Sequence, residues 1–217
     1  MKRHAFTMIE LVLVVVVLGI LAALALPRLQ RDLRQEAADN ILSSIRYTQH
    51  LALLDNKQRF NLPTWERRYW HLYFGTCDGK VFYAIGSDND MSGSDNARVQ
   101  SSEAAIDPAN GKLMWAQDAN CAGTLNKTSL SPNIFVGERY GVKTVTAGGG
   151  CSSRYIAFDH LGRPHQGVGF SKATKPVHAG YLNARCTLRF DLERGDPFTV
   201  NIEPETGYAY VDGQEDI

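Results

Sequence analysis

One short run of oxygen-bearing side chains has the spacing that calcium ligands need. Asp88, Asp90 and Ser92 occupy alternate positions, and Gly93 stands at the sixth place of the run. Calcium prefers oxygen ligands, and glycine at the sixth place permits the sharp turn of a calcium loop. The twelfth place is Val99, where an EF-hand carries a bidentate glutamate. The pattern therefore excludes an EF-hand and leaves either a looser calcium site or a solvated turn.

The chain has four cysteines, which could bind a metal or form disulfides: Cys77, Cys121, Cys151 and Cys186. None belongs to a C-x-x-C pair, so zinc ribbons and thioredoxin-type sites lack their usual spacing. If the domain is exported, an even number of cysteines favours two disulfides. If the domain is cytosolic, the alternative is four buried free thiols. Cys151 and Cys186 each precede a predicted strand, which favours the pairs Cys151–Cys186 and Cys77–Cys121 among the three possible pairings.

Enzyme motifs are missing from the sequence. There is no G-x-S-x-G, and the glycines at 148–150 are followed by Cys151 without the lysine of a phosphate-binding loop. His160, His165 and His178 fit no zinc template, and we expect them on the surface of a loop. The sequence therefore predicts a protein without catalytic residues and, calcium aside, without a cofactor.

Composition indicates a folded protein with no general affinity for nucleic acid. The chain has 217 residues, and 44% of them are hydrophobic. The charges of its 23 basic and 23 acidic residues cancel, so its formal net charge is zero. The segment from Trp65 to Trp70 mixes bases with aromatics, as single-strand binding sites do. However, Trp70, Leu72 and Phe74 alternate like a core strand. Nucleic-acid binding would need a local basic patch, and we do not expect it.

Glu10 is the one charge in an apolar run of 21 residues from Phe6 to Leu26. A helix of this length matches a bilayer core of roughly 30 Å. Lys2 and Arg3 precede the run and should remain cytoplasmic, which places the rest of the chain outside. A carboxylate within such a run costs a few kcal/mol and is usually retained for function.

Three interpretations of this N-terminus compete. The first is a secretory signal peptide cut after Ala25, and the second is a plain single-pass anchor. The third is a prepilin leader, and it alone gives the Glu10 carboxylate a role. Residues Ala5-Phe6-Thr7-Met8-Ile9-Glu10-Leu11 resemble the type III signal of type IV pilins and type II secretion pseudopilins.

That resemblance implies specific processing. A prepilin peptidase would cut between Ala5 and Phe6 and methylate the new amine of Phe6, although the family more often has glycine before the cut. Glu10 would then pair with the amine of a neighbouring subunit and set its register in a filament. Pro27 would occupy the position where pilins commonly carry a helix-loosening proline. Without Lys2 and Arg3, 21 basic and 23 acidic residues remain.

An amphipathic helix is predicted to continue beyond the apolar run. Pro27 removes one hydrogen bond and clashes with the preceding turn, which predicts a kink or local melting there. A stripe of apolar residues then recurs every four positions up to a helix end near Leu54. The stripe consists of Leu29, Leu33, Ala37, Ile41 and Ile45.

Short strands are predicted after Asn56, and none of the later segments has helical periodicity. Two hairpins are expected, one around the turn Cys77–Lys80 and one around Glu203–Gly207. The candidate strands are 70–74, 81–84, 134–136, 143–145, 154–158, 187–192, 198–202 and 208–211. The fold class is therefore α+β, with one long helix packed on an antiparallel β-sheet domain.

We expect four parts of the chain: a leader at 1–5, a transmembrane and filament-core helix at 6–26, an amphipathic helix at 27–54, and a periplasmic β-rich domain at 55–217. Within the last, Ile156–Pro164 and Val200–Tyr208 resemble the strand-turn segment and final hairpin of GspH/FimT-type minor pilins.

The GspH/FimT resemblance identifies a fold without marking a site. Gly162 and Gly207 are expected to supply turn geometry within the two similar segments. The region from Asp88 to Gly149 matches nothing in that group.

These resemblances imply a pseudopilin or minor pilin that joins a type II secretion pseudopilus or type IV pilus-like filament. Its expected partners are other pilin subunits, the prepilin peptidase and the inner-membrane assembly platform. It would lie in the bacterial inner membrane as a single-pass protein with a periplasmic domain, and then in the filament. The alternatives are a DNA-binding minor pilin for natural transformation and an exported binding domain unrelated to filaments.

Overall fold

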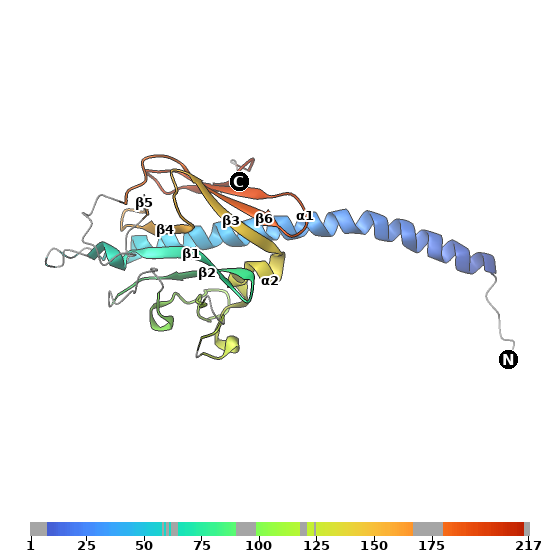
Figure 1. The fold of residues 1–217 in the computed structure, drawn as a ribbon, viewed down its shortest axis with the longest axis horizontal. Coiled ribbons are helices and arrows are strands. Elements are labelled where there is room, and N and C mark those ends of the chain that lie inside the picture. The colour runs from blue at the N-terminus through green and yellow to red at the C-terminus, as the bar shows by residue number, and fades with distance from the viewer. Residues whose placement is uncertain are drawn as a thin grey trace.

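The molecule consists of one long helix and a β-rich head that packs around the second half of that helix (Figure 1). The computed structural model describes residues 8–57, 59, 61, 65–89, 99–117, 121–123, 125–166 and 180–214, and their side chains except those of 22–32, 66 and 67. The first half of the helix projects away from the head (Figure 1). This arrangement confirms the predicted α+β class.

The helix α1 runs from Met8 to Leu54 as one continuous element. Its inward face in the head is made of small and branched residues, with Ala37, Ile41 and Ile45 at most 1% exposed. Because alanine has almost no side chain, the helix axis can lie close to the sheets, and the isoleucines fill the remaining space. The every-fourth-residue stripe thus marks the buried face correctly from Ala37 onward.

Leu33 departs from that prediction, because it is 37% exposed. It lies beside Leu192 at the end of a strand and Tyr140 of a short helix, where α1 emerges from the head. The four-residue repeat continues past the edge of the sheets, so the pattern alone cannot show where the covering strands end. The side chain of Leu29 lies outside the described residues.

The first sheet has the strand order β2-β1-β4-β5, and all its neighbouring strands are antiparallel. Strand β1 spans Trp70–Cys77 and pairs with β2, Lys80–Gly86, through the predicted hairpin turn. On its other side β1 pairs with β4, Tyr155–Phe158, which pairs with the short β5, Pro164–His165.

The second sheet has the order β3-β6-β7-β8 and is also antiparallel. Its strands are β3, Val142–Gly149; β6, Cys186–Leu192; β7, Phe198–Ile202; and β8, Ala209–Val211. The hairpin predicted around Glu203–Gly207 joins β7 to β8. The head thus contains two described sheets where the sequence predicted one, because strand patterns do not reveal which strands pair.

Both sheets contribute to one core around α1. The helix contacts β1 and β4 of the first sheet and β7 and β8 of the second. Phe74 of β1 meets Phe190 of β6 edge to face, with ring centroids 5.2 Å apart, so the two sheets join through aromatic contact. Ser44 of α1 donates to the hydroxyl of Tyr83 on β2 at 2.8 Å within this core, which helps to fix the position of the helix along the sheet.

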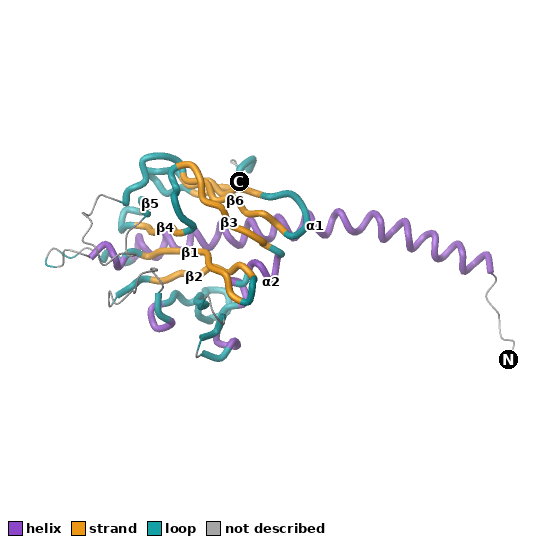
Figure 2. Tube along the Cα trace, viewed as in Figure 1, coloured by secondary structure: helices purple, strands orange, loops and turns teal. Residues whose placement is uncertain are grey.

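The described residues between β2 and β3 form an irregular layer that we call the insert; loops dominate it (Figure 2). It contains short 3-10 turns at Ser101–Glu103, Lys127–Ser129 and Pro132–Ile134, followed by the helix α2, Val136–Tyr140. A short 3-10 turn, Trp65–Arg68, precedes β1 outside the insert.

The strand predicted at 134–136 is wrong, because this segment bridges a 3-10 turn and α2. Ser131 accepts a hydrogen bond from the backbone N–H of Asn133, and Pro132 stands at the first helical position. A serine cap followed by proline starts a helical turn, and this local signal overrides the β propensity of the apolar residues that follow.

Asp107 anchors the insert from within. Its buried carboxylate accepts hydrogen bonds from the backbone of Ala109 and from the side chains of Asn110, Ser131 and Asn133. Burial raises the pKa of Asp107, and these hydrogen bonds outweigh it and lower the pKa below its usual value. The insert is therefore a folded part of the head.

Candidate processing and assembly site

The projecting half of α1 exposes a continuous apolar surface. Every described side chain from Met8 to Leu21 is exposed, including Met8 at 87% and Ile9 at 75%. Such a large contiguous apolar surface is unfavourable in water and marks contact with lipid or with other protein. No described helix is long and apolar enough to cross a membrane. The single span proposed for 6–26 therefore stays a prediction.

Glu10 lies in the first turn of α1 and its side chain is exposed. The free N–H groups at a helix N-terminus favour a negative charge in this turn. The Glu10 carboxylate is therefore favourable at this end of the helix. Its neighbours in the sequence are almost entirely apolar. Ala5 and Phe6, where cleavage and methylation are predicted, lie outside the described residues.

A known signal covers this N-terminus. Residues 1–26 match the prokaryotic N-terminal methylation motif. The motif is the prepilin signal of type IV pilin-like proteins. It indicates processing by a prepilin peptidase, and it indicates a location in the membrane or in a filament. It also indicates a structural subunit that assembles with other pilin subunits. No curated protein and no solved structure matches the chain significantly.

Pro27 falls within α1, which is assigned as helix on both sides of it. Its side chain lies outside the described ones, so the kink predicted there stays a prediction. The methylation motif ends one residue before it, and the amphipathic half of the helix follows.

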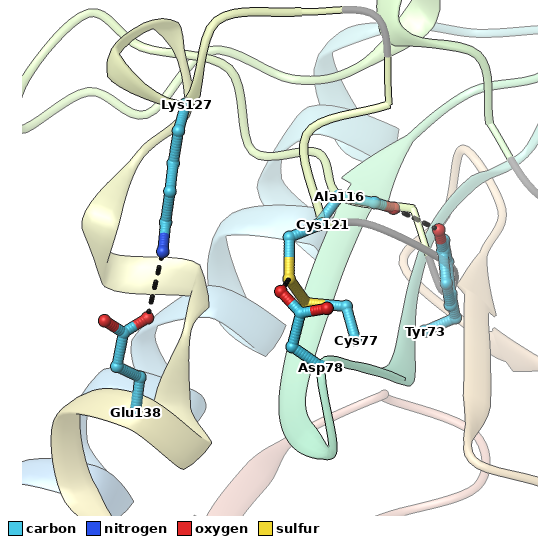
Figure 3. Close-up of a disulfide and its surroundings, with 7 residues drawn as sticks. All are labelled: Tyr73, Cys77, Asp78, Ala116, Cys121, Lys127 and Glu138. Atoms are coloured by element: carbon cyan, nitrogen blue, oxygen red, sulfur yellow. Dashed lines mark hydrogen bonds and ion pairs between the residues drawn. A yellow bond between two sulfur atoms is a disulfide. The ribbon is translucent and has the colours of Figure 1, made fainter.

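Two disulfides hold the head together, and they are the two predicted pairs. Cys77 at the end of β1 is bonded to Cys121 of the insert (Figure 3), and Cys151 after β3 is bonded to Cys186 at the start of β6. The described part of the chain has no free cysteine. Oxidised cysteines agree with an exported domain, since disulfides persist in oxidising compartments.

The surroundings of the first disulfide show how it fastens the insert. Cys77 and Cys121 are both almost fully buried, and the Asp78 carboxylate lies 3.3 Å from the Cys121 sulfur (Figure 3). Nearby, the Tyr73 hydroxyl donates to the carbonyl oxygen of Ala116 at 3.2 Å. The insert is thus attached to β1 by a covalent bond and a buried hydrogen bond.

The calcium ligands proposed from the sequence are only partly described. Asp88 is 4% exposed and lies two residues after β2, whereas Asp90 and Ser92 lie outside the described residues. Among the residues that the structure describes, no cluster of three or more histidine, cysteine, aspartate or glutamate side chains could hold a metal ion. Calcium binding at this loop stays a prediction.

A buried charge cluster at the turn after β4 was missed by the sequence analysis. Asp159 is fully buried and accepts hydrogen bonds from the backbone N–H groups of Leu161 and Arg163, each at 2.9 Å. Its other oxygen accepts from the Arg163 guanidinium at 2.8 Å and lies 3.1 Å from Nε2 of His165. An aspartate whose side chain accepts from the backbone N–H two residues later is a known turn signal. This signal could have indicated that Asp159 holds the turn together.

The cluster also corrects the expectation for the histidines. His165 is 3% exposed and packs between the rings of Tyr69 and Tyr181, so it is a core residue. Its expected surface position is wrong because the Asp159 carboxylate satisfies one ring nitrogen within the core. His160 is half-buried, and His178 lies outside the described residues.

The aromatic segment before β1 belongs to the core. Tyr69 is 4% exposed, and Trp65 and Trp70 are partly buried against the core cluster. The indole N–H of Trp70 donates to the Asp55 carboxylate at 3.0 Å. These rings therefore do not form an open platform on which nucleic-acid bases could stack.

Proposed function

We propose that this chain is the precursor of a filament subunit of the pseudopilin or minor pilin type. A prepilin peptidase cuts it between Ala5 and Phe6 and methylates the amine of Phe6. The mature subunit is held in the bacterial inner membrane by residues 6–26, with the head in the periplasm. It is then transferred by an inner-membrane assembly platform into a type II secretion pseudopilus or type IV pilus-like filament.

One observation carries this proposal: an exposed apolar half-helix that bears the methylation motif continues without interruption into a folded head. An ordinary secretory signal would be removed from the head and would need no continuity with its core helix. In this chain Ala37, Ile41 and Ile45 bind the same helix firmly into the core. A subunit that is pulled or shifted by its apolar half therefore carries its head along with it.

The Glu10 carboxylate has a specific role in the proposed assembly. Cleavage before Phe6 creates a positive amine four residues before Glu10. Both charges are costly in an apolar medium, and a neighbouring subunit shifted along the filament axis can place its amine beside this carboxylate. Such pairing sets the axial register of subunits in an open-ended, head-to-tail assembly.

The mass of the mature protein tests the processing step. The chain is expressed with a prepilin peptidase, and its intact mass should correspond to a protein that begins at Phe6 with one added methyl group. A mature chain that begins at Leu26 would instead identify a conventional signal peptide and overturn the proposal. An uncut chain that starts at Met1 would identify a plain anchor.

The kind of filament is proposed from the two head segments that resemble GspH/FimT-type minor pilins, Ile156–Pro164 and Val200–Tyr208. A strain without this protein should lose secretion or surface pili, when both are scored together with DNA uptake. Loss of DNA uptake alone, with binding of DNA by the purified protein at physiological salt, would support the DNA-binding alternative.

A further inference from the structure

A pocket of about 350 Å³ opens in the insert, outside the two head segments that resemble GspH/FimT-type pilins. Leu130, Pro132 and Phe135 form its apolar lining. Leu130 and Phe135 are 2% and 6% exposed, so they belong to the packed core and give the pocket a rigid floor. This volume has room for one large apolar side chain together with part of the backbone that carries it, and the lining is apolar.

The rim of the pocket is positively charged. Lys112, Lys127 and Arg139 line it, together with one acid, Glu138. Lys127 forms an ion pair with Glu138 at 3.4 Å, and the two side chains point toward each other in Figure 3. Among the rim residues that the structure describes, the one acid is thus already neutralised, and two cations, Lys112 and Arg139, remain to meet a partner. This is a local excess in a chain whose net charge is zero.

Two of the rim cations are held in place. The Arg139 guanidinium donates to the side-chain oxygen of Asn133 at 2.7 Å and lies 5.3 Å from the centre of the Tyr140 ring. The ammonium of Lys127 lies 5.4 Å from the centre of the Phe135 ring. Lys127 is thereby kept with Glu138, whereas Arg139 is a preorganised charge that loses less side-chain entropy when it binds a carboxylate of a partner.

From this arrangement we propose that the pocket binds an acidic segment of a partner protein that presents one large apolar side chain. The apolar side chain rests on the floor formed by Leu130, Pro132 and Phe135 and acts as the anchor, as buried central residues do at protein interfaces. Carboxylates on either side of it pair with Lys112 and Arg139 at the rim, which sets the preference for an acidic partner.

The proposal does not depend on filament assembly, because it rests on the insert alone. The disulfide Cys77–Cys121 and the hydrogen bonds to Asp107 fix the insert to the head whatever the N-terminal helix does. Binding can therefore be measured on the full chain in detergent micelles, where failure of processing or assembly has no effect on the result.

The experiment is a fluorescence anisotropy titration of the full chain with labelled pentapeptides. The first has phenylalanine flanked by two aspartates on each side. The second replaces the aspartates by lysines, and the third replaces the phenylalanine by glycine. We expect the first to bind at least about tenfold more tightly than either of the others, and its affinity to fall as salt is raised.

Matched variants identify the pocket. Arg139→Ala should weaken binding of the acidic peptide about threefold to tenfold, and Glu138→Gln should strengthen it because the rim becomes more positive. Arg189→Ala is the control, since Arg189 is an exposed arginine on β6 outside the pocket, and it should leave the affinity unchanged. Thermal melting of each variant verifies that the head is folded.

Three results would overturn the proposal. The first is no binding of the acidic peptide by the folded wild-type chain at millimolar concentration. The second is equal affinity for all three peptides, which would leave the pocket without selectivity. The third is an equal loss of affinity in Arg139→Ala and Arg189→Ala, which would indicate attraction to the whole surface rather than binding at this site.

Discussion

The side-chain amide of Gln49 on α1 donates a hydrogen bond to the carbonyl oxygen of Gly162 at 2.8 Å. The same nitrogen donates to the carbonyl oxygen of Thr206, also at 2.8 Å. Gly162 belongs to the turn after β4 and Thr206 to the turn between β7 and β8, so one helix side chain joins a turn of each sheet. These are the two turns whose sequences resemble GspH/FimT-type pilins.

Replacement of Gln49 by alanine should loosen this junction. The change removes both hydrogen bonds and leaves two turn carbonyls without their donor, at a cost of about 1–2 kcal/mol in the free energy of unfolding. Thermal or denaturant unfolding measures the loss. Ser43→Ala is a matched control on the exposed face of the same helix and should change stability by less than about 0.5 kcal/mol.

Gly207 should tolerate no side chain. Its φ is +66°, and a Cβ atom there would lie 2.3 Å from the carbonyl oxygen of Gly162. Gly207→Ala should therefore cost about 3 kcal/mol or more, from backbone strain and overlap together. Gly213 has a φ of +77° but open space around it, so Gly213→Ala should cost only about 1 kcal/mol. Equal losses in the two variants would contradict the close approach of the turns.

Each disulfide should stabilise the head by a similar amount. The bonded cysteines are separated by 44 residues in Cys77–Cys121 and 35 in Cys151–Cys186, and loops of this size predict a loss on the order of 4 kcal/mol when either bond is removed. Serine replacement of both partners tests each bond. Hydrogen exchange should increase mainly in the insert in the first case, and at the β3–β6 end in the second. The same exchange pattern in both variants would argue against separate roles.

Stability should fall in acid through Asp159. Burial raises the pKa of this carboxyl, but hydrogen bonds from His165 and Arg163 outweigh that effect and lower the pKa from 3.8 to about 2. Because this pKa is lower in the folded state than in the unfolded state, the ionised carboxyl stabilises the head by about 2 kcal/mol above pH 4. This contribution is lost as the pH falls toward 2.

The comparison with Asp159→Asn isolates that contribution. The variant should be less stable at pH 7, and the difference from the wild type should shrink between pH 4 and pH 2 in urea unfolding series. Asp107, whose pKa is also lowered, contributes to the slope of both proteins and therefore cancels in the difference. A difference that stays constant over this range would show that the Asp159 carboxylate does not titrate as inferred.

Glu10→Ala should block filament incorporation and leave the head folded. The carboxylate lies in the first turn of α1, far along the chain from the core residues that begin at Ala37. Its removal should make residence in the membrane easier, since an apolar residue replaces a charge. Cross-linking between subunits in cells measures incorporation, with Glu10→Asp, which keeps the carboxylate, as the control. Normal assembly of Glu10→Ala would show that the carboxylate has no role in register.

The sequence by itself determined the elements whose signals are local. The methylation motif, the buried face of the helix from Ala37 onward, both hairpins and the turn glycines Gly162 and Gly207 depend on residues close together in the chain. Apolar periodicity, turn chemistry and a short processing motif can each be read from a few neighbouring residues. The favoured disulfide pairs also agree with the structure.

Only the tertiary structure decided which distant residues meet. It separated the strands into two sheets, placed His165 against Asp159 in the core, and brought Gln49 to the turns of both sheets. It also brought Lys112 and Arg139 to the rim of one pocket in the insert. Strand partners and buried polar pairs are selected by packing of the whole chain, because many alternatives have the same local pattern and differ only in the core they build.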